Sequence, residues 1–76
     1  MVDHKLIVKR AVERLCTAII VVHNHPSGIA RPSDEDIALT RRLETAAALF
    51  DISLLDHMII TPGECFSFRK HGLIAK

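Results

Sequence analysis

The apolar run TAIIVVH, residues 17–23, predicts a β-strand at the centre of the fold. Most of its residues are β-branched, and such side chains pack well on the pleated surface of a strand. Polar residues do not alternate with apolar ones along the run, as they do in a strand that exposes one face to water. We therefore expect a central strand that is buried on both faces and ends before Pro26.

Two helices are predicted around this strand. Asp3 can cap a first helix over residues 4–15. Its apolar face consists of Val8, Ala11, Val12 and Leu15. After a loop at residues 26–32, a second helix opens at Ser33 and runs to about Phe50. Its apolar stripe consists of Leu39, Leu43, Ala46 and Phe50.

A β-hairpin is predicted to follow. Residues 52–61 form one strand and residues 65–68 a second, and Pro62-Gly63 between them fits a type II turn. The order helix, strand, helix, strand, strand is typical of an α/β or α+β domain. A chain of 76 residues forms one domain or part of one, because a domain this small buries only about 60% of its unfolded surface.

Composition excludes several classes of protein. The chain is 49% hydrophobic and 25% charged with a net charge of +1, as in ordinary globular proteins. It has no apolar run of the roughly 20 residues that a membrane-spanning helix needs and no apolar signal-peptide core, so we expect a cytoplasmic protein without a membrane partner. No block of basic residues supports nucleic-acid binding. Two cysteines, Cys16 and Cys65, are too few for a disulfide framework, and we expect both to be buried.

The chemistry is predicted at the end of the central strand. His23 and His25 are two residues apart, so a strand presents both imidazoles on the same side. Zinc favours imidazole nitrogens, and a catalytic zinc site has three protein ligands with a fourth position for water. Asp36 is the best third ligand, because a loop long enough to fold back leads to it and the free N–H groups of a first helical turn stabilise a carboxylate.

Ser33 is the candidate catalytic residue beside these ligands. A bound zinc lowers the pKa of its water to about 7 and polarises a substrate carbonyl, and the Ser33 hydroxyl can donate to the developing oxyanion. A structural interpretation stands beside this one, since Ser-x-x-Asp resembles a capping box and histidines at strand ends often only form hydrogen bonds. His57 is a further ligand, a partner that orients His23 or His25, or a structural residue, and we favour the last two interpretations.

The motif of these residues resembles the JAMM signature, which is H-x-H, seven residues, Ser, two residues and Asp. Residues 23–36 match every spacing, and the form HNHPSG at 23–28 is similar to that of the RadC family. Further similarities are TRRL at 40–43, LDHMII at 55–60, and SFR at 67–69 with Gly72-Leu73. The resemblance implies an MPN (JAB-like, cytidine-deaminase-like) mixed sheet flanked by helices, and Zn²⁺ held by His23, His25 and Asp36. It also implies metallohydrolase or metallopeptidase activity on peptide or isopeptide bonds.

The family pattern includes a glutamate, on an early strand well before the first histidine, that acts as general acid and base. Only 22 residues precede His23, so we expect residues 1–76 to be a partial MPN domain that lacks the first strands. The open sheet edge would then be covered by a partner chain or a second copy. General acid and base catalysis contributes about 10² to 10⁴ in rate, so we expect zinc affinity with weak or no hydrolysis. The alternatives are a non-catalytic module stabilised by metal and an accessory protein of DNA repair.

Overall fold

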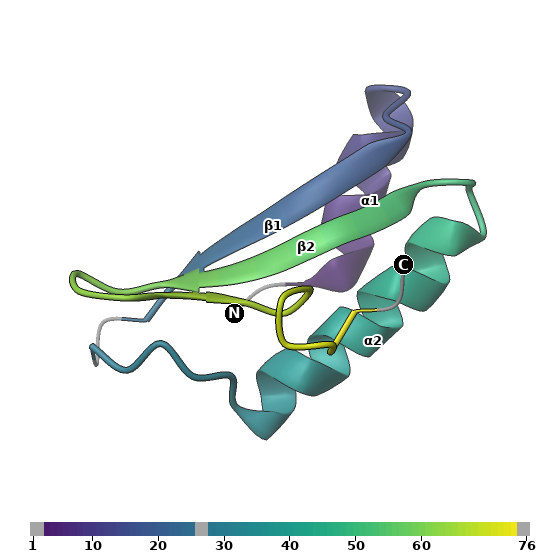
Figure 1. The fold of residues 1–76 in the computed structure, drawn as a ribbon. Helices are drawn as coiled ribbons and strands as arrows, with labels where there is room; N and C mark the ends of the chain where they lie inside the picture. Colours follow the sequence, from purple (N-terminus) through teal and green to yellow (C-terminus); the bar gives the residue numbers. More distant parts are fainter. Residues whose placement is uncertain (1–2, 26–27, 75–76) are drawn as a thin grey trace.

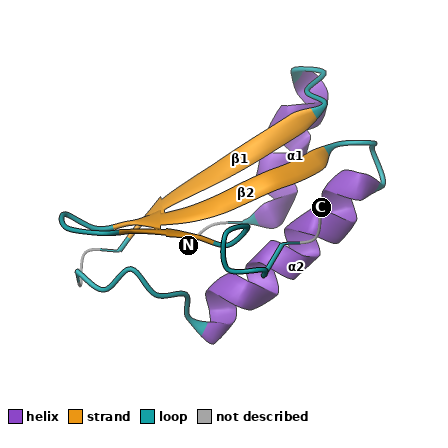
Figure 2. Ribbon diagram, in the orientation of Figure 1, coloured by secondary structure: helices purple, strands orange, loops and turns teal. Residues whose placement is uncertain are grey.

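A computed structural model describes residues 3–25 and 28–74 of the chain. The elements are α1 (His4–Glu13), β1 (Ala18–Asn24), α2 (Asp34–Ala48), β2 (Ser53–Ile60) and β3 (Cys65–Ser67), in the predicted order. Both helices pack on the same face of the sheet (Figures 1 and 2). The α+β class is therefore confirmed, as a two-layer arrangement. Within the described ranges, no helix is long and apolar enough to cross a membrane.

The three strands form one mixed sheet in the order β1-β2-β3. β1 and β2 are parallel, with Val21 opposite His57 and His23 opposite Ile59, and α2 lies in the crossover between them. β2 and β3 are antiparallel, with Met58 opposite Ser67, which confirms the predicted hairpin. Because β1 and β2 run in the same direction, their carboxyl ends lie at the same end of the sheet (Figure 1).

The turn of this hairpin differs from the prediction. A type II turn needs a positive φ at its third residue, but the glycines with positive φ are Gly28 and Gly72, not Gly63. Thr61 and Glu64 close the turn instead. The Thr61 N–H donates to the Glu64 carbonyl at 2.9 Å, and the Thr61 hydroxyl accepts from the Glu64 N–H at 3.0 Å. A side-chain oxygen thus replaces the carbonyl that accepts this bond in a regular turn.

β1 is an edge strand, so the prediction of a central strand buried on both faces is wrong for the described chain. Its residues alternate between exposed and half-buried along the whole strand. Ile19 and Val21 face the helices and pack against the core, whereas Ile20 and Val22 are 56% and 58% exposed on the opposite face. The reason is that both helices lie on one side of the sheet and β2 pairs with only one edge of β1.

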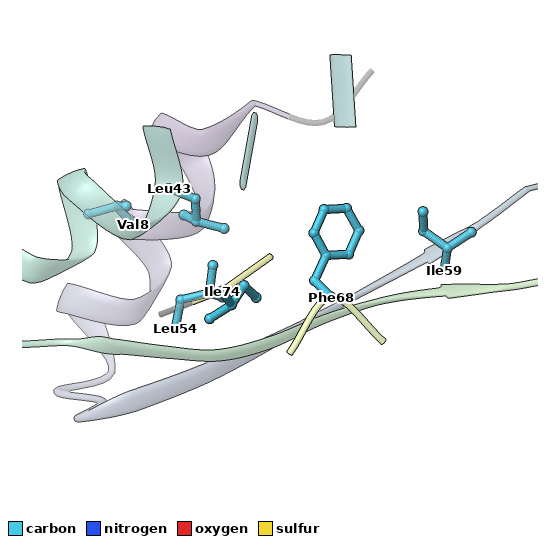
Figure 3. Close-up of a cluster of buried hydrophobic side chains, with 6 residues drawn as sticks. All are labelled: Val8, Leu43, Leu54, Ile59, Phe68 and Ile74. Carbon is cyan, nitrogen blue, oxygen red and sulfur yellow. The ribbon is translucent and has the colours of Figure 1, made fainter. Parts of the chain in front are cut away.

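The core lies between the sheet and the two helices. Its main cluster takes one residue from each helix and the others from β2 and the segment after β3 (Figure 3). The members are Val8, Leu43, Leu54, Ile59, Phe68 and Ile74. A smaller cluster of Ala11, Ala47 and Ile52 extends this core. The packing of α2 against β2 is thus fixed by apolar contacts below the carboxyl end of the sheet.

Both predicted helices end earlier than expected, which changes their apolar faces. Leu15 adopts a left-handed φ of 55°, so α1 stops at Glu13 and the Leu15 side chain is 87% exposed. α2 stops at Ala48, which leaves Phe50 outside the helix and exposed. Ala47 is fully buried on the core face of α2. The predicted membership of Leu15 and Phe50 in the apolar faces is therefore wrong.

The expectation of two buried cysteines is also wrong. Cys16 is half-buried against the smaller cluster, and Cys65 is exposed. Cys65 precedes Phe66 on β3, and Phe66 packs against the core. Neighbouring residues of a strand point to opposite faces, so Cys65 must point to the outer face of the sheet.

Replacing Leu43 by alanine is expected to lower the free energy of unfolding by about 2–5 kcal/mol, because the fully buried side chain leaves a cavity. Leu49→Ala is the matched control, since Leu49 directly follows the same helix and is 79% exposed. Its effect should stay within about 0.5 kcal/mol. Urea unfolding measures both, and equal effects of the two substitutions would contradict the described packing of α2.

Candidate metal centre

His23 and His25 lie on the same side of the chain at the carboxyl end of β1. The His25 N–H donates to the Ile60 carbonyl at 3.1 Å, so the ladder with β2 continues one residue beyond Asn24. This extension keeps His25 in register with His23, and the two ring centroids are 4.6 Å apart in an edge-to-face arrangement. The prediction that the spacing brings both imidazoles together is confirmed.

The first turn of α2 brings Asp36 to the two histidines. Asp36 Oδ1 lies 3.5 Å from His23 Nδ1, and Oδ2 lies 3.3 Å from His25 Nε2. One ligand atom from each of the three residues can be chosen so that all three lie within 4.8 Å of one another, so the group can hold a metal ion. Two ligands at zinc distances in a tetrahedral site are roughly 3.4 Å apart. The distances from the two Asp36 oxygens to the imidazole nitrogens are close to this value.

The hydrogen bonds of the imidazoles leave the right nitrogens for a metal. His25 Nδ1 lies 3.2 Å from the Ile29 carbonyl, and a carbonyl can only accept, so this nitrogen carries the proton. A neutral His25 then has its lone pair on Nε2, the atom that faces Asp36. His23 Nδ1 is buried and has no hydrogen-bond partner among the described residues. A buried ring nitrogen that makes no hydrogen bond can bind a metal ion through its lone pair.

Asp36 is held by a reciprocal capping box. Its N–H donates to Ser33 Oγ at 3.1 Å, and its Oδ2 accepts from the Ser33 N–H at 2.9 Å. Burial of the carboxyl group raises its pKa. The hydrogen bonds from Ser33 and the electrostatic effect of the neighbouring His23 and His25 outweigh the effect of burial, so the pKa of Asp36 is lowered overall. At neutral pH the side chain is therefore an anion, ready to bind a cation.

A cleft opens beside these ligands. Its volume is about 950 Å³, and His23, His25 and Asp36 contribute to its lining. Ser33 lines the same cleft, so the predicted catalytic residue lies next to the predicted ligands. The capping interpretation of Ser33 is confirmed by its bond with Asp36. Capping leaves a catalytic role open, because a hydroxyl that accepts one bond can still donate another.

His57 and Thr40 belong to the surroundings of the site, and their pairing was not predicted. His57 is fully buried, its ring stacks against His23 with centroids 5.7 Å apart, and its Nδ1 is 2.6 Å from Thr40 Oγ1. Burial lowers the pKa of His57, and the charge of His23 lowers it further, so the ring is neutral at pH 7. The structure agrees with the structural or orienting interpretation of His57. Thr40 follows Asp36 by one helical turn, and this spacing is the feature of the sequence that could have placed Thr40 next to the site.

The charge of Asp36 should make a pH-dependent contribution to stability in the absence of metal. Because the folded-state pKa lies below the ordinary value of 3.8, the contribution is present above the unfolded-state pKa and is lost as the pH falls through the folded-state pKa. Asp36→Asn keeps an acceptor for the Ser33 N–H but removes the charge. The stability difference between wild type and variant should therefore shrink from about pH 5 to about pH 3.

Urea unfolding with a chelator present measures this difference. Asp56 also has a lowered pKa, but it titrates in both proteins and cancels in the comparison. A difference that stays constant or grows as the pH falls would show that the carboxylate is not stabilised in the folded state.

Comparison with known proteins agrees with the motif. The RadC-like JAB domain model matches residues 1–73. A UPF0758 protein of Acidithiobacillus ferrooxidans is 53% identical over 66 residues, which cover 87% of this chain and 30% of that protein. A UPF0758 protein of Chloroflexus aggregans is 57% identical over 65 residues, covering 86% and 28%. One of Porphyromonas gingivalis is 51% identical over 73 residues, covering 95% and 32%.

The chain thus spans about a third of the length of these curated relatives. The match to the family model nevertheless extends over almost all of its residues, and it includes the two histidines, Ser33 and Asp36. On this evidence the chain belongs to the RadC-like JAB domain family.

Proposed function

We propose that this chain binds a zinc ion through His23, His25 and Asp36, and that the ion serves a metallohydrolase or metallopeptidase reaction. The observation that carries the proposal is the position of the Asp36 carboxylate, 3.5 Å from His23 Nδ1 and 3.3 Å from His25 Nε2. Two imidazoles and one carboxylate are a common ligand set of catalytic zinc. Zinc held by these residues would lower the pKa of a bound water and would act as a Lewis acid towards a carbonyl oxygen.

Other groups of the chain orient the proposed ligands and can stabilise the carbonyl oxygen of a substrate. His25 is oriented by the Ile29 carbonyl, and Asp36 is oriented by the Ser33 N–H, so neither ligand has to reorganise when a metal arrives. The Ser33 hydroxyl accepts from the Asp36 N–H and retains its own hydrogen for donation. We propose that it donates to the oxygen of an amide carbonyl in the cleft as negative charge develops there.

The substrate class we propose is a peptide or isopeptide bond. The cleft beside the ligands is open and has room for an extended chain. The glutamate that the family pattern calls for has no matching position in residues 1–76. We therefore propose metal binding as the part of the reaction that the residues of this chain carry.

Purified wild-type chain is expected to retain about one zinc ion after dialysis, and His23→Ala should retain none, because loss of one of three ligands opens the site. His71→Ala is the control, since His71 is exposed and lies outside the ligand group. Atomic absorption measures the metal. Equal metal content in wild type and His23→Ala would contradict the proposal.

A non-catalytic role for the metal is the second candidate. The ligands come from β1 and from the first turn of α2, so an ion would join the sheet to a helix across the small core. The same samples distinguish the two roles when they are incubated with a fluorogenic isopeptide. Zinc-dependent hydrolysis supports the catalytic role, whereas a lower melting temperature after chelation without any hydrolysis supports the structural one.

We also propose that a second copy of the chain covers the free edge of β1. The strand carries no charged residue or proline along this edge, and Ile20 and Val22 are exposed beside it. The chain exposes 5461 Å² of surface, whereas a folded monomer of its mass exposes about 4,700 Å². The excess is close to the roughly 800 Å² that each partner buries in a standard interface.

Wild-type chain is expected to dimerise as its concentration rises, and Val22→Lys should remain monomeric because a lysine on an edge strand opposes further pairing. Leu15→Lys is the control for added charge, since Leu15 is exposed and lies outside the sheet. Light scattering across a concentration series measures the mass. A wild-type chain that stays monomeric throughout would show that a second copy is not the partner.

A further inference from the structure

His57 and Thr40 form a polar pair inside the core, under the candidate metal centre. The exposed fractions are 0% for His57 and 1% for Thr40, and the distance from His57 Nδ1 to Thr40 Oγ1 is 2.6 Å. Thr40 Oγ1 also donates to the Asp36 carbonyl at 2.8 Å. Polar groups in a small core cost stability relative to apolar residues of similar shape. Their presence calls for an explanation beyond packing.

The protons of this chain of hydrogen bonds can be assigned. The single hydroxyl hydrogen of Thr40 is used on the Asp36 carbonyl, so Oγ1 can only accept from His57. His57 Nδ1 therefore carries a proton, and because the buried ring is neutral this is the Nδ1–H tautomer. Its Nε2 is then a bare acceptor, buried and without a partner among the described residues. The hydrogen bonds therefore run in one direction. His57 on β2 donates to Thr40, and Thr40 donates to the backbone carbonyl of Asp36.

The same imidazole also contacts a second ligand. The His57 ring stacks against His23 at 5.7 Å and 24°, and against Phe68 at 4.5 Å and 6°. Phe68 is itself fully buried in the main core cluster. Phe68 thus holds the His57 ring in place, and the His57 ring in turn holds the His23 imidazole in its orientation.

We propose that His57 and Thr40 are positioning residues that hold His23 and Asp36 in the arrangement needed to bind a metal. The inference rests on the proposed zinc site and adds to it two residues that do not touch the ion. Thr40 fixes the backbone of Asp36 through its carbonyl, and His57 fixes both Thr40 and the ring of His23. Loss of such outer partners typically weakens metal affinity about 10–100-fold.

Thr40→Val tests the pair, because valine keeps the shape of threonine and replaces the hydroxyl by a methyl group that can neither donate nor accept a hydrogen bond. Zinc affinity, measured by competition with a chromophoric chelator, is expected to fall about 10–100-fold, and the visible spectrum of the cobalt-substituted protein should change. Thr40→Ser restores the hydroxyl and should return the affinity close to the wild-type value. The matched control is Thr45→Val, since Thr45 donates to the Arg41 carbonyl in the same way on the exposed side of the same helix.

A second readout needs no metal. Long-range ¹H–¹⁵N spectra of the histidine rings should show the Nδ1–H tautomer for His57 in the wild type and a mixture of tautomers in Thr40→Val. Melting temperatures of the metal-free variants report any loss of folding. Where Thr40→Val unfolds, the wild-type tautomer decides, because an Nε2–H form of His57 would overturn the assigned chain of bonds.

The outcomes separate this inference from the zinc site itself. A wild-type chain that binds zinc, together with a Thr40→Val variant of equal affinity, overturns the positioning role and leaves the metal site intact. Equal losses in Thr40→Val and Thr45→Val would also overturn it, because the effect would then belong to the helix in general. A wild-type chain without zinc affinity overturns the positioning role and the proposed function together.

Discussion

The Asp36 carboxylate accepts the N–H of Ser33 and faces two imidazoles at the same time, and the site exists because both contacts come from one side chain. The bond with Ser33 fixes where α2 begins. The contacts with His23 and His25 fix where that beginning lies relative to the end of β1. The same local arrangement therefore starts the helix and places the carboxylate beside the imidazoles. The positive end of the helix dipole, in the first turn, favours the negative charge of this carboxylate.

The sheet that carries the histidines is covered unequally. Two helices and the segment after β3 bury one face, while Ile20 and Val22 stay exposed on the other. A small domain buries little apolar surface, so each apolar residue that stays exposed is a substantial loss of buried area. The relatives are about three times as long as this chain, so the two-layer core described here is the packing of one portion of the family's sequence.

Features that depend on residues close together in the sequence were predicted correctly from the geometry of strands and helices. The spacing of His23 and His25, the position of Asp36 in a first helical turn, and the order of the elements all follow from periods of two and of 3.6 residues. The burial of β1 did not follow, because it depends on how many layers cover a sheet. The turn at Gly63 was also wrong, since a threonine side chain replaced a backbone acceptor. The meeting of Thr40 with His57, 17 residues later, required the crossover itself.

The site is assembled from two rigid parts, with the imidazoles on the sheet and the carboxylate on the helix. The separation of the two parts therefore depends on the core beneath them, to which α2 contributes the buried side chains of Leu43 and Thr40. Residues outside the ligand group therefore set the separation between the carboxylate and the imidazoles, so a change in that layer would alter the geometry of the site without touching any of its three side chains.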